Sequence, residues 1–239
     1  MKKIFLLLTL VFVTACNNKN EHSDKNLHIT GSIEGLKQGT IYVKHIKDTL
    51  VETLDSISIK GNSTFESHIN IAEPEMLYLF LDRGNTQSLD NSVEFFAEPG
   101  NITLKTTLKE FYAKMKVEGS ENHTLYEEFK NYKSRFNDEN LKLIEARLKN
   151  QEKNNLKTAD SIENEYAKLL KRKYLYTANF AVNHSDKEIA PFIALSEISN
   201  ANIILLDTIQ KSMTDKIKKS LYGKKLTTFV NERKKLENQ

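Results

Sequence analysis

The thiol of Cys16 is the side chain best suited to chemistry, because this is the only cysteine in the 239-residue chain. A lone thiol cannot form an internal disulfide or a Cys-x-x-Cys pair, so thiol–disulfide exchange within the chain is excluded. The thiol can still be acylated. Lys2 and Lys3, an apolar block over residues 4–13 and the small residue Ala15 precede it. This order is typical of a secretory signal peptide, whose apolar core is too short to span a bilayer.

The four residues Val13-Thr14-Ala15-Cys16 resemble the lipobox of bacterial lipoproteins. The resemblance implies that a signal peptide over residues 1–15 is removed and that Cys16 is lipidated as the new N-terminus. Residues 16–26 are polar and lack periodicity, so we expect a flexible tether. Two or more acyl chains give stable anchoring. We therefore expect a lipid-anchored cell-envelope protein, at the outer membrane on its periplasmic or surface side.

The six histidines have no spacing that would place two of them on one helix face, and HExxH is absent. His28, His45 and His68 lie on neighbouring predicted strands and could converge on a metal. Scattered histidines on half-buried strands need no ligand, however. We therefore expect no metal site and no cofactor.

Two close acidic pairs could take part in acid–base catalysis, Asp48/Glu52 and Glu73/Glu75. A glycosidase needs two carboxylates at a defined separation in space, which sequence spacing does not supply. Solvated carboxylates are the usual alternative. We therefore expect no catalytic residue, and a carboxylate-dependent hydrolase of envelope or dietary glycans is the alternative function.

Four tripeptides match an Asp-Ser/Thr-apolar sequon that is associated with O-glycosylation of exported Bacteroidetes proteins. Composition alone predicts about half a match. The candidate acceptors are Thr49, Ser56, Ser161 and Thr208. Asp55-Ser56 also has a structural interpretation, as part of a strand edge.

The elements that must position these residues change type near residue 119. Over residues 27–118, short apolar runs alternate with turn residues, which predicts about eight strands in an antiparallel β-sandwich or open barrel. Gly61-Asn62 predicts a hairpin turn, and Pro99-Gly100 a type II turn. The run 76–81 is apolar on both faces, as expected of a central strand.

Residues 121–237 have apolar residues at helical spacing and contain one proline and one glycine. We expect Asp138 to cap a second helix, and Ser185 to Glu188 to form a capping box. Asp207 or Thr208 is expected to open a later helix, which Gly223 stops. The polar stretch 151–158 is either a break or a solvated continuation of a helix. The fold class is therefore α+β, with a β-sandwich-like domain followed by an all-helical region.

Three stretches resemble the DUF4369 domain of Bacteroidetes lipoproteins: Leu54–Ile57 with Gly61 and Phe65, Phe96–Ile102, and Val117–Asn122. The resemblance covers roughly residues 27–235. In many of those lipoproteins a thioredoxin-like module follows such a domain and a helical segment.

The stretch Ser220–Lys225 resembles the helix before the thioredoxin-like module, but no Cys-x-x-Cys is present. Redox activity therefore does not carry over to this chain. We expect it to correspond to the non-catalytic half of that architecture, and a degenerate remnant is a further alternative.

The charge of the chain is uneven. Residues 17–120 hold 11 Lys and Arg against 15 Asp and Glu, whereas residues 121–239 hold 22 against 17. The basic residues of the last helices are Lys216, Lys218, Lys219, Lys224, Lys225, Arg233, Lys234 and Lys235. Such a face is either simply solvated or meets anionic headgroups or an acidic partner. Few aromatic residues lie among the lysines, so we expect no nucleic-acid partner.

These observations favour a non-enzymatic interaction or binding module at a membrane. The expected partners are the membrane itself, through the N-terminal lipid, and a protein. A separately encoded thioredoxin-like protein is one candidate, because the resemblance places such a module next to this kind of domain.

Overall fold

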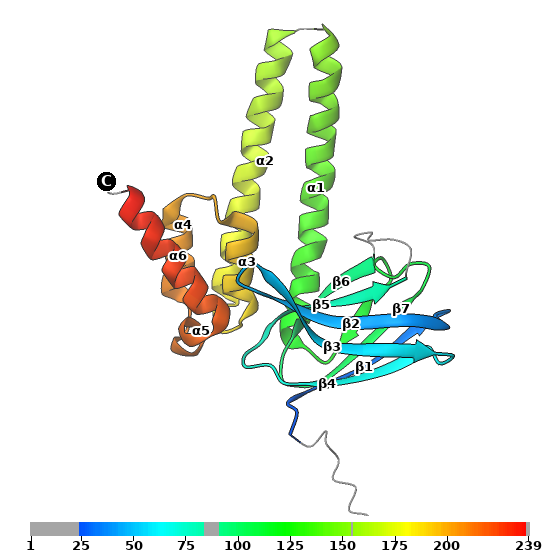
Figure 1. The fold of residues 1–239 in the computed structure, drawn as a ribbon. Coiled ribbons are helices and arrows are strands. Elements are labelled where there is room, and N and C mark those ends of the chain that lie inside the picture. The colour runs from blue at the N-terminus through cyan, green and yellow to red at the C-terminus, as the bar shows by residue number, and fades with distance from the viewer. Residues whose placement is uncertain (1–23, 84–90, 154, 238–239) are drawn as a thin grey trace, which may run out of the picture.

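The structure is a computed structural model that describes residues 24–83, 91–153 and 155–237. Along these residues the chain forms eight strands and then six helices (Figure 1). The predicted α+β class, with strands over 27–118 followed by helices over 121–237, is confirmed. The predicted signal peptide, Cys16 and most of the predicted tether lie outside the described residues.

The strands form two four-stranded sheets with a shared apolar core. The first sheet has the order β4-β1-β7-β8 and the second the order β3-β2-β5-β6. The strands are β1 (Leu27–Glu34), β2 (Gln38–Lys47), β3 (Leu50–Lys60), β4 (Thr64–Ile69), β5 (Glu75–Asp82), β6 (Ser92–Ala97), β7 (Gly100–Thr107) and β8 (Lys116–Glu118). Ile29 and Ile102 from the first sheet and Leu77 and Phe95 from the second belong to one buried cluster. This arrangement is the sandwich that the strand pattern predicts.

Two turns carry the chain between the sheets rather than between paired strands. The predicted hairpin at Gly61-Asn62 is wrong, because β3 and β4 belong to different sheets. The Gly61 N–H donates to the carbonyl of Lys37 in the β1–β2 connection, and the Ile33 N–H of β1 donates to that of Ser63, so these two bonds hold the turn. Pro99-Gly100 likewise joins β6 of the second sheet to β7 of the first. As a result β7 lies parallel to β1, an exception to the predicted antiparallel sandwich.

Two long helices, α1 (Glu121–Lys153) and α2 (Leu156–Asn183), form a hairpin that stands out from the rest of the molecule (Figure 1). The 33 residues of α1 extend about 50 Å at 1.5 Å per residue. The chain turns between them inside the polar stretch 151–158, where Asn155 caps α2. The predicted helix start at Asp138 is wrong, since α1 continues through it. Aspartate in a helix costs at most about 0.7 kcal/mol, and packing against α2 outweighs that cost.

Four shorter helices pack beside the lower part of α2 (Figure 1). They are α3 (Ile189–Ile198), α4 (Ile203–Ser212), α5 (Asp215–Lys219) and α6 (Leu221–Glu237). The predicted opening of a helix at Asp207 or Thr208 is wrong, because Asn202 accepts the Ile204 N–H and caps α4 there.

Two further helix-boundary predictions are also wrong. The capping box from Ser185 to Glu188 does not form, because Glu188 turns inward to Asn122 instead of reaching back. Gly223 lies inside α6 rather than ending a helix. A Cβ atom at position 223 would lie 1.7 Å from the carbonyl oxygen of Ile217, so glycine is needed where α5 and α6 meet.

The outer face of the second sheet is covered by helices. Met76 on β5 and Phe96 on β6 pack with Tyr126 and Phe129 of α1 and with Phe180 of α2. The residues on the other face of β5, including Leu77, belong to the core of the sandwich. This explains why the stretch 76–81 is apolar on both faces.

Candidate functional site

A groove of about 450 Å³ lies where the sandwich meets the C-terminal helices. It is lined by the end of β2, the connection between β4 and β5, and the start of α6. The lining residues are His45, Ile46, Lys47, Asp48, Leu54, Asn70, Ile71, Ala72, Glu73, Glu75, Leu221 and Lys225. Apolar side chains and both signs of charge therefore face the same space, which suits a mixed ligand such as a peptide segment.

The β2–β3 hairpin forms one wall of the groove. Lys47 pairs with Leu50 across the turn, and Asp48 adopts a φ of 57°. Aspartate tolerates this left-handed backbone better than most residues because its short side chain bonds locally. Leu50 and Val51, just past the turn, are 66% and 63% exposed. They form an apolar tip beside the groove.

The connection from β4 to β5 forms a second wall and is held by Asn26. The Ile71 N–H donates to Asn26 Oδ1 at 3.0 Å, and Asn26 Nδ2 donates to the Ile71 carbonyl at 2.7 Å. The Asn26 N–H in turn donates to Asn70 Oδ1 at 3.0 Å. These three bonds hold the connection against the chain just before β1.

His45 lies between two carboxylates at the edge of the groove. Its Nε2 lies 3.1 Å from Glu52 Oε2, and its Nδ1 lies 3.2 Å from Glu75 Oε2. The His45 and Glu75 side chains are 16% and 13% exposed, whereas Glu52 is 47% exposed. An imidazole bonded on both nitrogens is held in one orientation, so this cluster is a rigid part of the groove.

The structure rearranges the predicted acidic pairs. Glu52, from one predicted pair, and Glu75, from the other, meet on His45. His45 and Glu52 are direct partners across the β2–β3 ladder. A hairpin turn centred on Asp48 and Thr49 would have predicted that pairing from the sequence. Glu75 comes from a separate strand, and no local signal pointed to it.

Tyr222 holds the start of α6 against the sheet beside the groove. The Met76 N–H donates to the Tyr222 hydroxyl at 2.9 Å, and the ring of Tyr222 contacts those of Phe96 and Phe192. Burial of the hydroxyl raises the pKa of Tyr222. Lys224, two residues on, lies 3.2 Å from Glu73 Oε1. The groove therefore has two walls from the sandwich and one from the start of α6, and the bonds of Tyr222 and Lys224 join α6 to the sandwich.

A second polar cluster joins the sandwich to the helices at the start of α1. Glu98 accepts the N–H groups of Glu121 and Asn122, so a carboxylate from the β6–β7 turn caps α1. Asn122 is 1% exposed. Its Nδ2 donates to Glu98 and to Glu188 at 3.1 Å each, and its Oδ1 accepts the Ile189 N–H at 2.9 Å. Two stretches that carry the family resemblance, 96–102 and 117–122, thus contact each other.

Glu188 is 4% exposed and completes this cluster. Its other oxygen, Oε1, lies 3.1 Å from Nζ of Lys216 on α5. A buried carboxylate needs such partners. The sequence predicted no contact for Asn122 and placed Glu188 in a capping box instead, because the partners of both side chains are distant along the chain.

His123, which follows Asn122 in α1, links β6 to the helix by a hydrogen bond. The Phe96 N–H donates to His123 Nδ1 at 3.2 Å, so Nε2 carries the proton and points to Glu127 Oε1 at 3.4 Å. The bond from His123, together with the nearby Lys130, lowers the pKa of Glu127 to about 2.

His28, His45 and His68 do not come together in one metal site. His28 and His68 are cross-strand partners on β1 and β4, with their Nδ1 atoms 2.7 Å apart. His45 lies on the other sheet and does not join them. Among the residues described, no group of three or more His, Cys, Asp or Glu side chains could hold a metal ion.

The four sequon acceptors occupy different settings. All four residues are exposed: Thr49 in the β2–β3 turn, Ser56 on β3, Ser161 on α2 and Thr208 on α4. The hydroxyl of Thr208 donates to the Ile204 carbonyl within its helix. Asp55, next to Ser56, accepts bonds from the Ser56 N–H and the Ser67 hydroxyl. O-glycosylation stays a prediction at all four positions.

The basic C-terminal helices are partly neutralised within the chain. Lys216 pairs with Glu188, Lys224 with Glu73, and Lys234 with Asp207. Some of this charge therefore stabilises the fold. No helix among the described residues is both long enough and apolar enough to cross a membrane.

Residues 27–126 match the family model of DUF4369, a domain of unknown function. The resemblance predicted for the β-domain is confirmed. The matched range includes all eight strands and the first turns of α1, with Asn122 and His123. Extension of the resemblance over the later helices stays a prediction. A search of curated proteins found no match to the chain.

Proposed function

We propose that this DUF4369-bearing chain is a cell-envelope lipoprotein, anchored through Cys16, that acts as a non-catalytic interaction module. Support for the anchor comes from the sequence: two lysines, a short apolar block, and an alanine directly before the only cysteine. Support for the binding role comes from the groove at the junction of sandwich and helices and from the apolar hairpin tip beside it.

The proposed ligand is an extended segment of a protein partner. β3 is the edge strand of the second sheet, and an edge strand presents backbone groups that can pair with an added strand. Leu50 and Val51 at its start are exposed. A segment that pairs with this end of β3 would place a side chain in the groove near Leu54 and Leu221. The partner could be a separate thioredoxin-like protein, as the family resemblance suggests.

The anchor is tested by metabolic labelling with an alkyne palmitate analogue in a bacterial host that has the lipoprotein pathway. The wild-type chain should carry the label and fractionate with membranes. Cys16→Ser should lose the label and leave the membrane fraction. A membrane-bound, unlabelled wild-type chain would refute the anchor.

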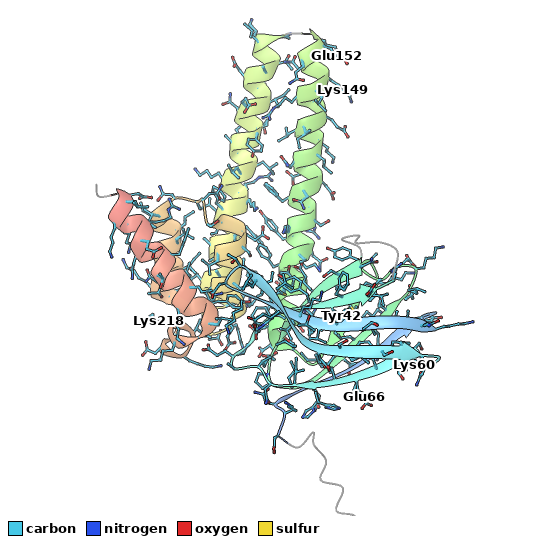
Figure 2. The ribbon with its side chains drawn as sticks, in the orientation of Figure 1. Tyr42, Lys60, Glu66, Lys149, Glu152 and Lys218 are labelled. Carbon is cyan, nitrogen blue, oxygen red and sulfur yellow. The ribbon has the colours of Figure 1, made fainter. Side chains whose placement is uncertain are left out.

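The binding site is tested by photo-crosslinking in cells. A photoreactive residue at Val51 should capture one protein, and the same residue at Glu66 on β4, which is also exposed (Figure 2), should not. Val51→Lys should weaken binding of that purified protein by about tenfold or more. Equal capture at both positions, or an unchanged Kd for Val51→Lys, would contradict this site.

A hydrolase is the second candidate function, because His45 and two carboxylates lie together at the groove. In such an enzyme Glu75 would act as the buried acid and Glu52 as the exposed base. A glycan-hydrolysis screen with the wild type, Glu75→Gln and Glu52→Gln tests it. Cleavage that either substitution abolishes would favour the hydrolase, and cleavage that survives both would count against it.

A further inference from the structure

The outer half of α1 carries six charged side chains whose sign alternates along one stripe. They recur at intervals of three and four residues, so they lie on one side of the helix. The stripe consists of Arg135, Asp138, Lys142, Glu145, Lys149 and Glu152. All six are exposed, and none has an ion-pair partner within residues 24–83, 91–153 and 155–237. We call this set the charged stripe.

An apolar stripe runs beside the charged stripe. Leu141, Ile144 and Leu148 directly precede Lys142, Glu145 and Lys149 in sequence, so the two stripes are about 100° apart around the helix. Their side chains are 56%, 41% and 57% exposed, respectively. Three large aliphatic side chains at helical spacing thus stay in contact with water on a helix that protrudes from the fold.

The charged stripe lies opposite the side of α1 that packs on α2, and the apolar stripe lies between these two sides. The side that packs on α2 is marked by Phe129 and Phe136, which are buried, and by Arg147, which pairs with Glu163. Figure 2 shows Lys149 and Glu152 near the tip of the hairpin, on the side of α1 away from α2. The face formed by the two stripes has no covering element in the described chain.

We propose that the face formed by the two stripes binds a second copy of this chain, with the two α1 helices antiparallel. In a pairing centred between Leu143 and Ile144, Arg135 faces Glu152 of the other copy. Asp138 then faces Lys149, and Lys142 faces Glu145. Because the dimer has two-fold symmetry, each of these three ion pairs forms twice, once in each direction. The apolar stripes meet at nearly the same centre, since Leu141 and Leu148 lie on either side of Ile144.

The alternation of charge selects the antiparallel arrangement. A parallel pairing in register would place every charge opposite its own copy, which is repulsive. The antiparallel overlap ends where the tip of one α1 reaches Ser134 of the other. That position lies above Phe129, where α1 begins to pack on the sandwich. The sandwiches of the two copies, with their short helices, therefore lie at opposite ends of the paired α1 helices.

Sedimentation equilibrium of the full chain in density-matched detergent tests the proposal. The wild type should form dimers. Lys142→Glu should raise the dimer Kd by about tenfold or more, because the new carboxylate of each copy then repels Glu145 of the other. The double variant Lys142→Glu/Glu145→Lys should restore dimerisation, because it exchanges the central pair between copies.

The double variant also excludes an effect within one helix. It places a carboxylate at position 142, four residues from Asp138, and an ammonium group at position 145, four residues from Lys149. Like charges thus become neighbours in each helix, so rescue must come from the other copy.

Ile144→Asp tests the contribution of the apolar stripe to the same interface. It should abolish dimers and leave the circular dichroism unchanged, since Ile144 is exposed. A monomeric wild type, or a double variant that dimerises no better than Lys142→Glu, would overturn the proposal.

Discussion

At the residue scale, the buried Asn122 side chain makes three hydrogen bonds that join the sandwich to the helices. Its amide joins carboxylates from the β6–β7 turn and from the start of α3, and its oxygen accepts the Ile189 N–H. Only an uncharged side chain with both donors and an acceptor can make these three bonds. Aspartate would add a third carboxylate, and leucine would leave Glu98 and Glu188 without this donor.

We expect Asn122→Ala to lower the free energy of unfolding by about 2–4 kcal/mol, because the buried Glu188 and the half-buried Glu98 each lose a hydrogen bond. Urea denaturation followed by circular dichroism measures the change. Asn131→Ala, on an exposed position of the same helix, should change stability by less than about 0.5 kcal/mol. Equal effects of the two substitutions would show that the Asn122 bonds contribute little.

Glu127 should make stability depend on pH in the acid range. The bond from His123 lowers its pKa from 4.5 to about 2 in the folded protein. The folded state therefore holds the proton less tightly than the unfolded state does. The resulting stabilisation is full above pH 4.5 and is lost as the pH falls through 2.

Comparison of the wild type with Glu127→Gln between pH 6 and pH 2.5 tests this effect. The variant should be less stable at pH 6, and the difference should shrink as the pH falls. Glu127 is half exposed, so solvent reduces the size of the effect. Glu128→Gln, on the exposed neighbouring residue, should keep the wild-type pH dependence. A constant difference between Glu127→Gln and the wild type would refute the assignment.

At the scale of elements, the close contact between α5 and α6 requires glycine at position 223, because glycine has no Cβ atom. Ser220 separates the two helices, and Gly223 lets the first turn of α6 lie against the Ile217 carbonyl. This close approach brings the Tyr222 hydroxyl within hydrogen-bond distance of the Met76 N–H. It also places Leu221 in the lining of the groove. The position of one groove wall therefore depends on Gly223.

Gly223→Ala should destabilise the protein by about 2 kcal/mol or more, because the new Cβ would overlap the Ile217 carbonyl oxygen. In an unconstrained helix the same change stabilises by about 1 kcal/mol, so the sign of the effect is diagnostic. Thermal denaturation measures it. Thr228→Ala, at an exposed position of α6, serves as the control and should be close to neutral.

At the scale of the whole molecule, an aromatic cluster makes the sandwich and the helices one structure. Phe96 is fully buried and contacts the rings of Phe192 and Tyr222. Its neighbours come from β5 and from α1, α2, α3 and α6. Separating the two parts would expose this cluster together with the polar cluster at Asn122, so we expect them to unfold together.

Phe96→Ala should lower the free energy of unfolding by about 3–5 kcal/mol. Strand and helix signals should still disappear in a single urea transition. Phe80→Ala is a matched control, because Phe80 lies on the same outer sheet face, beside Tyr42, and is only partly buried. Its effect should be clearly smaller. Two separate transitions in the wild type would show that the sandwich and the helices fold independently.

The features predicted correctly from the sequence depend on neighbours in the chain. The alternation of apolar residues predicts strands up to residue 118, and the 3.6-residue period predicts helices after it, since each pattern reports which face of a local element is buried. Val117–Asn122 and Phe96–Ile102 also carried the family resemblance that the domain match confirms. Helix boundaries were less predictable. Asp138 is exposed and α1 continues through it, because packing of the helix outweighs the weak local preference. Gly223 is needed for a close contact with Ile217 rather than as a local stop.

Only the tertiary structure decided which residues meet. Local propensity could not reveal that Gly61-Asn62 joins different sheets, or that β1 and β7 are parallel. The Glu52–His45–Glu75 cluster and the Glu98–Asn122–Glu188 cluster each join segments that are far apart in the sequence. Local patterns determine which face of an element is buried. The partner that covers that face is chosen by the packing of the entire chain, and so the candidate groove became visible only in the folded molecule.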